Sequence, residues 1–190
     1  MDEFIHIDKT FDKVMFFDKK ITGREFDSCT FNNCDFSNTT FSECVLSDCE
    51  FTDCNLSNVK FPGTSLKTVA YKKCKLLGIR FDECHDFLFS VTFNECVLDY
   101  SWFSNKKMPK TTFENCSLKE VNFANADLSK AVFANCNLQG TLFDATVLKE
   151  TDFRTAYNFT IDPENNPMKN ARFSTEGLSG LLNKYDIKIV

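Results

Sequence analysis

Residues 29–56 read CTFNNCDFSNTTFSECVLSDCEFTDCNL, and the cysteines of this stretch fall five or ten positions apart. Phe or Leu stands two positions after every one of these cysteines. Neither an α-helix nor a β-strand has a period of five residues, so the stretch fits neither an amphipathic helix nor an alternating strand. A short fixed period that covers most of a chain is typical of a solenoid.

The same period continues far to both sides of this stretch. We call the large residue of each five-residue unit its centre, and the residue two places before it the small slot. Centres run from Phe11 to Phe81 and resume from Phe93 to Phe153. The gap between Phe81 and Phe93 is twelve residues instead of ten, which indicates two extra residues near His85-Asp86-Phe87. We therefore predict a register slip within residues 82–92, across which a 22-residue step keeps aromatic centres over aromatic centres.

Several units resemble those of a known family. CDFSN, CNLSN, VNFAN, ADLSK and CNLQG are similar to the A(D/N)LXX unit of pentapeptide-repeat proteins, and the resemblance covers roughly residues 11–157. It implies an all-β fold, a right-handed quadrilateral β-helix of about seven coils with one unit on each side. Centres and small slots would point inward. We expect residues 1–157 to form this β-helix, and residues 158–190 to form a turn, a short amphipathic α-helix and a terminal strand.

The cysteines are interpreted as structural. Nine of the ten occupy small slots and Cys84 keeps the same five-residue period. A free thiol acts there as a small apolar side chain, so we expect all ten buried and reduced. The neighbours Cys84, His85 and Asp86 leave open a metal site or a Cys-His nucleophile, but a zinc site needs three or four converging ligands. The chain also lacks the common catalytic motifs. We expect no enzyme activity, no catalytic residue, no metal and no cofactor.

Two places depart from the pattern. Lys19 and Arg24 stand in small slots, which predicts an irregular first coil, and residues 4–7 are candidates for a cap at this end. Lys106 and Met108, within SNKKMPK, predict a loosened side without a change of register.

Charge is arranged in bands along the sequence. A first band holds seven acids and no base, and we predict that these acids form a partner-binding acidic face: Glu25, Asp27, Asp35, Glu43, Asp48, Glu50 and Asp53. A second band, from Lys60 to Arg80, holds six bases and no acid. Ion pairs between coils explain part of the pattern, because Asp53, Lys73 and Glu95 would share one column. The same stacking places Arg80 under Trp102, within reach of a cation–π contact.

The C-terminal tail has helical spacing. Ser174 or Thr175 is a plausible helix cap, followed by an apolar face. The tail resembles that of the Qnr, MfpA and McbG type, in which Qnr and MfpA members dimerise end to end. That resemblance implies a homodimer; the alternative is that the tail only caps its own last coil. The expected dimerisation residues are Leu178, Leu181, Leu182, Tyr185, Ile187 and Ile189.

The sequence is consistent with two hypotheses for the function. The resemblance implies a non-enzymatic DNA mimic that binds DNA gyrase or topoisomerase IV and protects against quinolones. The alternative is a structural or adaptor solenoid that binds an unrelated protein, because a fold does not determine a function. The net charge of −5 disfavours direct binding of nucleic acid. We expect a cytoplasmic protein without membrane contact, because the sequence shows no signal peptide and no apolar stretch of membrane-spanning length.

Overall fold

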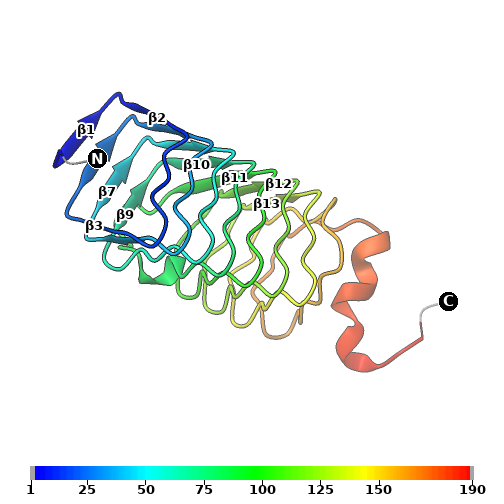
Figure 1. Ribbon diagram of the computed structural model, residues 1–190. Helices are drawn as coiled ribbons and strands as arrows, with labels where there is room; N and C mark the ends of the chain where they lie inside the picture. Colours follow the sequence, from blue (N-terminus) through cyan, green and yellow to red (C-terminus); the bar gives the residue numbers. More distant parts are fainter. Residues whose placement is uncertain (1–2, 189–190) are drawn as a thin grey trace.

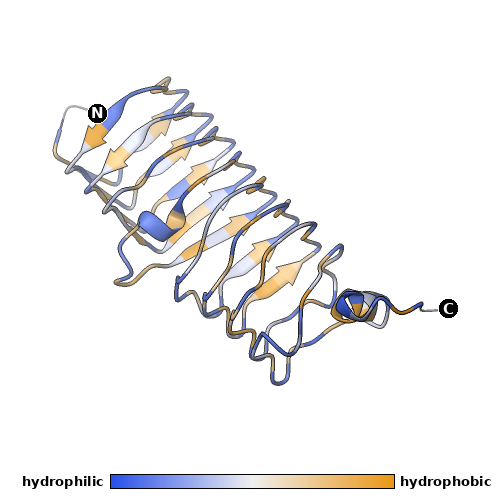
Figure 2. Ribbon diagram, turned by 90° about the horizontal axis from the view of Figure 1, so that it is seen from below, coloured by the Kyte–Doolittle hydropathy of each residue, from blue (hydrophilic) through white to orange (hydrophobic). Residues whose placement is uncertain are grey.

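The computed structural model describes residues 3–188 and shows a straight rod of stacked square coils. The chain winds around the rod axis from the N-terminal end to a short helical segment at the other end (Figure 1). Seen from below, the coils follow one another along the axis with the helical segment beyond the last of them (Figure 2). The predicted fold class, a pentapeptide-type β-helix, is confirmed.

Strands are short because each side of a coil is only five residues long. The strands are β1 (Ile5–Ile7), β2 (Thr10–Asp12), β3 (Lys20–Thr22), β4 (Glu25–Asp27), β5 (Thr30–Asn32), β6 (Thr40–Ser42), β7 (Val45–Ser47), β8 (Glu50–Thr52), β9 (Ser65–Lys67), β10 (Val69–Lys72), β11 (Val91–Asn94), β12 (Thr112–Glu114) and β13 (Val132–Ala134). Three 3-10 segments complete the elements: η1 (Phe81–Glu83), η2 (Glu176–Leu181) and η3 (Asn183–Tyr185).

All strand pairing is parallel, and it defines four sides of the rod. The first side is the sheet β1-β4-β7-β9, and the second is the seven-stranded sheet from β2 to β13. The third side is a ladder of single bridges from Met15↔Asp35 to Asn137↔Tyr157. The fourth side is β3-β6, continued by bridges that include Arg80↔Trp102 and Asn122↔Leu142.

Centres and small slots point inward, as predicted, and fill the rod. Every centre from Ile21 to Phe153 is buried, and most expose none of their surface. On the second side the rings form one stacked column: Phe11, Phe31, Phe51, Tyr71, Phe93, Phe113, Phe133, Phe153 and Phe173. This column continues past residue 157, where we placed the end of the β-helix.

Corners explain why Asn, Asp and Gly follow so many centres. The residue two places after a centre commonly has a positive φ, for example 53° at Asn33, 57° at Asn38 and 50° at Asp48. Asn and Asp tolerate this left-handed conformation better than most residues, and Gly adopts it without steric cost. The corner residue therefore turns the chain onto the next side.

The register slip is present where it was predicted. Tyr71 pairs with Phe93 and Arg80 with Trp102, both 22 residues apart, whereas Phe31 pairs with Phe51 after 20. The segment 85–90 leaves the first side as a bulge after η1 (green in Figure 1), and Phe87 is 74% exposed. The four-stranded sheet of the first side ends at β9, immediately before this bulge.

Two local expectations are wrong. The first coil pairs regularly through β1, β2 and β3, so its irregularity is limited to side chains: Lys19 is exposed and Arg24 stacks on the Phe4 ring. The side containing Lys106 and Met108 is not loosened. Both side chains are 2% exposed, and the Met108 amide donates to the Asp127 carbonyl at 2.9 Å, because Lys106 fills space that the bulge opens.

The tail has the predicted helix, but as the 3-10 segments η2 and η3. The Ser174 hydroxyl accepts a hydrogen bond from the Gly177 amide at 3.2 Å, as expected of a cap. Ile187 and Lys188 are not in a strand, and Ile189 lies outside the described residues. No helix among residues 3–188 is long and apolar enough to cross a membrane.

Candidate interaction surfaces

The thiols are part of the core. All ten cysteines are free and buried. The Sγ of a typical one, Cys49, lies 3.4 and 3.3 Å from the Phe26 and Ser47 carbonyl oxygens, and its one S–H donates toward them. Burial raises the pKa of Cys49 to about 12 and that of Cys34 to about 11. These thiols are therefore protonated at neutral pH, whereas the nucleophile and the metal ligand are thiolates.

The neighbours Cys84, His85 and Asp86 do not converge. Cys84 is buried, His85 is exposed, and the Asp86 carboxylate accepts a hydrogen bond from the Lys106 ammonium at 2.6 Å. Within the described part of the chain no group of three or more His, Cys, Asp or Glu side chains is placed to hold a metal ion.

Lys106 has a structural role at the bulge that the sequence analysis did not predict. Its ammonium also donates to the Cys84 carbonyl and lies 5.2 Å from the centroid of the Phe89 ring. A buried cation is tolerated only when it is paired and hydrogen-bonded, and here the bulge supplies every partner. The detectable signal was a long cation in a small slot 22 residues after Cys84, one coil beyond the slip.

The seven predicted acids do not share one side of the rod. Glu25 and Asp27 lie on the first side, Glu50 on the second and Asp35 on the third. The other three, Glu43, Asp48 and Asp53, are exposed corner residues with φ between 50° and 55°. The seven together form an acidic collar around three sides and their corners, and none lies on the fourth side.

Most of these carboxylates form no ion pair with a cation among residues 3–188. Glu50 is the exception: the Lys72 ammonium lies 2.9 Å away and lowers its pKa. The predicted ion-pair ladder of Asp53, Lys73 and Glu95 is not formed among the described residues, although the three occupy equivalent corners. Exposed pairs of this kind gain little free energy, and long side chains remain solvated instead.

The basic band is one complete coil with a cation on every side. Lys67 lies on the first side, Lys72 on the second, Lys75 on the third, and Lys60 and Arg80 on the fourth. Arg80 stacks 4.7 Å from the Trp102 ring, which confirms the predicted cation–π contact. It also pairs with Asp82 at 2.6 Å.

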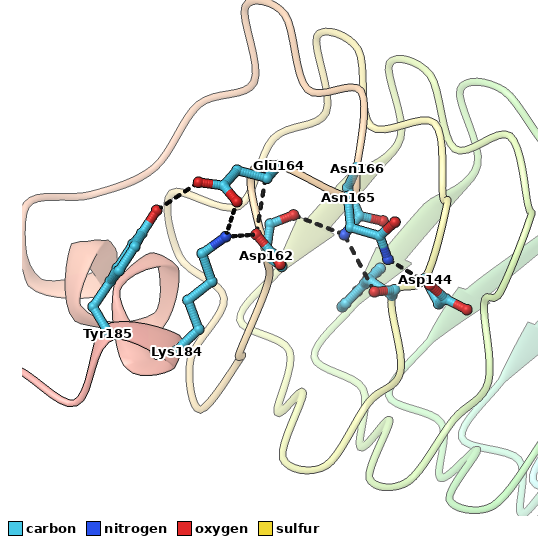
Figure 3. Close-up of polar contacts among 8 residues, drawn as sticks. Asp144, Asp162, Glu164, Asn165, Asn166, Lys184 and Tyr185 are labelled. Carbon is cyan, nitrogen blue, oxygen red and sulfur yellow. Dashed lines mark hydrogen bonds and ion pairs between the residues drawn. The ribbon is translucent and has the colours of Figure 1, made fainter.

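The tail lies across the end of the last coil (Figure 3). The Ile161 amide donates to the Gly180 carbonyl at 3.0 Å, and Gly180 lies against Phe159 so closely that a Cβ there would come within 2.3 Å of the Phe159 carbonyl oxygen. The Lys184 ammonium lies 2.7 Å from Asp162 and 2.6 Å from Glu164. Hydrogen bonds from Lys184 lower the pKa of both carboxylates.

The predicted dimerisation residues divide into two groups. Leu181 and Leu182 are half-buried, and Leu181 packs against the core. Leu178, Tyr185 and Ile187 are 45%, 50% and 57% exposed. The Tyr185 hydroxyl donates to Glu164 at 2.8 Å, which holds η3 against the coil. The segment thus caps its own rod and still presents apolar side chains to solvent.

Comparisons with known proteins agree with this architecture. The model of the pentapeptide repeat region matches residues 24–103, and that of the SV2A/B/C luminal domain matches residues 65–143. A comparison with the sequences of curated proteins gives no match.

Two solved structures of trypsin-treated variants of QnrB1, a plasmid-mediated fluoroquinolone resistance protein, share the fold. One has a TM-score of 0.52 at 20% identity and covers 98% of this chain and 91% of its own. The other has a TM-score of 0.53 at 21% identity and covers 96% and 99%. At this identity the likeness concerns the fold alone, and it extends over the tail. With its inward columns and left-handed corners, the chain has the pentapeptide-repeat β-helix fold, and residues 24–103 match the model of the pentapeptide repeat region.

Proposed function

We propose that this chain is a non-enzymatic, protein-binding rod whose acidic collar competes with DNA for the DNA-binding surface of DNA gyrase or topoisomerase IV. The observation that carries the proposal is the collar itself. It holds seven carboxylates on a rigid scaffold, with no base from Glu25 to Val59. Of these, Glu50 alone is paired within the described chain. A rigid anionic surface is attracted to the basic saddle that receives DNA.

We name DNA gyrase and topoisomerase IV as partners because the chain shares its fold with QnrB1, a fluoroquinolone resistance protein. The basic coil limits which part of the rod can imitate DNA. DNA has no cationic stripe, so contact with the enzyme would be limited to the collar and would not extend along the whole rod.

A supercoiling assay with purified gyrase, with and without a quinolone, tests the proposal. We expect the wild-type chain to inhibit supercoiling or to restore it in the presence of the drug, with an effect that weakens steeply as salt is raised. The triple variant Glu43→Gln, Asp48→Asn, Asp53→Asn removes three exposed collar charges and should lose most of the effect. A matched variant, Glu95→Gln, Glu120→Gln, Glu176→Gln, removes three exposed charges elsewhere and should retain it.

No effect of the wild-type chain at micromolar concentration would exclude these enzymes as partners. The adaptor function would then be favoured, and one observation already supports it: the rod presents surfaces of opposite charge on different sides. An effect that is equal for the two triple variants would mean that the collar is not the contact.

We also propose that two rods associate through their tails. The support is the apolar surface that remains exposed on the capping segment at Leu178, Tyr185 and Ile187. Leu178→Ser with Ile187→Ser should convert a dimer to a monomer in sedimentation equilibrium without lowering the melting temperature, because neither side chain packs into the core. A monomeric wild-type chain would assign the tail to capping alone.

A further inference from the structure

The fourth side differs from the other three in its outward column. One outward residue from each coil lines up along the rod, and the column reads Lys20, Thr40, Lys60, Arg80, Trp102, Asn122 and Leu142. It contains no carboxylate. Its cations lie toward the N-terminal end and its apolar residues toward the C-terminal end.

The apolar part of this column is exposed although nothing in the fold requires it there. Trp102, the single tryptophan of the chain, is 40% exposed, and Leu142 is 46% exposed. The two are two coils apart, which corresponds to about 10 Å at ordinary strand spacing. Tyr100, at the corner beside Trp102, is 61% exposed. Trp, Tyr and Arg are the residues most enriched where binding energy concentrates in protein interfaces.

Arg80 is held in one orientation beside this apolar part. Its guanidinium lies over the Trp102 ring and donates two hydrogen bonds to Asp82, at 2.8 and 2.6 Å. Because the strands of a β-helix are rigid, a partner that meets Trp102 and Arg80 would lose little conformational entropy on the side of the rod.

The cationic part gives the surface its polarity. Lys20 and Lys60 are exposed, and neither forms an ion pair with any residue from 3 to 188. Asp82 is engaged by Arg80, and the outward column from Lys20 to Arg80 carries three cations and no carboxylate. The complementary ligand carries carboxylates at one end and apolar side chains at the other.

We infer that the fourth side is a docking surface for a protein segment of this kind, acidic at one end and apolar at the other, that lies along the rod axis. Lys20, Lys60 and Arg80 face its carboxylates, while Tyr100, Trp102 and Leu142 contact its apolar side chains. This surface is separate from the acidic collar, which leaves the fourth side free, and its charge is opposite. The rod thus presents two surfaces that select different partners.

Selection from a library of random peptides displayed on phage, with the full chain as bait, tests this inference. We expect the selected peptides to combine Asp or Glu with large apolar residues. A synthetic peptide of the winning sequence, followed by fluorescence anisotropy, should bind Trp102→Ser about thirty-fold more weakly than wild type. Lys60→Glu should weaken binding about tenfold at low salt and less at high salt.

Two matched variants separate this side from the rest of the rod. Tyr157→Ser removes an aromatic side chain that is 49% exposed on the third side. Lys67→Glu reverses the charge of a cation on the first side, in the coil of Lys60, that forms no ion pair within residues 3–188. Both should bind the peptide within about twofold of wild type, because neither touches the fourth side. All four variants change outward residues, so equal melting temperatures will show that each is folded.

Four results would overturn the inference. Three are a failure to select any peptide, selected peptides without carboxylates, and equal affinity for wild type and Trp102→Ser. The fourth is self-association of the wild-type chain that Trp102→Ser abolishes, which would assign the face to a second copy.

Discussion

The coils from Phe93 to Phe153 and the coil that contains the bulge solve one packing problem in two ways. In the regular coils the rings of the second side stack at 5.2, 4.8 and 5.0 Å, and the small slots Cys96, Cys116 and Cys136 fill the space between. In the bulged coil the rings of the second side also stack, with Tyr71 and Phe93 5.3 Å apart, but the extra residues place Phe89 edge-on against Phe81, and a lysine occupies the small slot of the next coil. The difference shows that two extra residues are accommodated when one long side chain reaches into the space they leave.

The largest expected effect tests the regular coils. Phe123→Ala removes a ring that exposes none of its surface and that stacks on Phe103 and Phe143. The free energy of unfolding should fall by about 3–5 kcal/mol, as for other buried aromatic residues. Urea unfolding followed by circular dichroism measures it. A loss below about 1 kcal/mol would mean that the columns are not closely packed.

The bulged coil should depend on Lys106. Lys106→Ala leaves the Cys84 carbonyl without a donor and opens a void beside Phe89, so we expect a loss of about 2–3 kcal/mol. Lys107→Ala, at the exposed neighbour, should change stability by less than about 0.5 kcal/mol. Equal stabilities of the two variants would show that Lys106 is not the anchor of the bulge.

A deletion sharpens the comparison further. Removal of Asp86 and Phe87 restores the 20-residue step between coils. Leu88 then stands two residues after Cys84, in the position of a regular centre. With Lys106 retained, this variant should be less stable than wild type because the ammonium is buried without its carboxylate. Adding Lys106→Ala should recover about 2 kcal/mol, the opposite sign from its effect in wild type. The same sign in both backgrounds would mean that bulge and lysine are not coupled.

Thiols in both kinds of coil should make the protein sensitive to alkali. Burial raises the pKa of Cys49, in a regular coil, to about 12, and it also raises the pKa of Cys84, at the bulge. A thiol whose pKa is higher in the folded state contributes its full stability below the unfolded pKa, about 9, and loses it as pH rises toward the folded pKa. Each such thiol should therefore cost up to about 1.4 kcal/mol at pH 10.

Chemical denaturation at pH 8 and pH 10 measures this loss. Cys49→Ala should reduce the difference between the two pH values by the share of one thiol, whereas Lys107→Ala should leave that difference unchanged. An unchanged difference in Cys49→Ala would show that this thiol does not account for the alkaline loss.

The smallest expected effect concerns the coil immediately before the slip. Tyr71 is 1% exposed, and its hydroxyl is buried without a hydrogen-bond partner in the described structure. Tyr71→Phe removes an unsatisfied polar group and keeps the ring, so it should stabilise the protein by about 1 kcal/mol. Tyr185→Phe, which removes a hydroxyl bonded to Glu164, should not stabilise it. A destabilised Tyr71→Phe would indicate that the hydroxyl has a partner.

Periodicity predicted the fold because each inward residue meets only its neighbours one coil away. The step from Tyr71 to Phe93, the burial of the ten thiols and the stacking of Arg80 on Trp102 all follow from counting residues. The role of Lys106 did not, since it depends on where the bulged backbone leaves its carbonyl groups. The acidic face was misplaced for a related reason: Glu25, Asp35 and Glu50 are close in sequence, but the chain turns a corner every five residues.

The structure of the tail was likewise only partly predictable from the sequence. Helical spacing predicted a helix, yet the contact of Gly180 with Phe159 and the ion pairs of Lys184 depend on the last coil, where the repeat fades. Helix type and docking are set by that contact and not by the spacing of leucines.

The four-sided coil also constrains how such a gene can change in length. Gain or loss of 60 nucleotides adds or removes one complete coil and leaves every column in register, so it alters the reach of the rod without altering its cross-section. An insertion that is not a multiple of 20 residues has to bulge outward, as residues 85–90 do, and needs an inward side chain on the next coil to fill the space behind it. Duplication of whole coils therefore leaves the packing of the core unchanged. Each insertion of another length instead remains visible as a bulge on the outer surface.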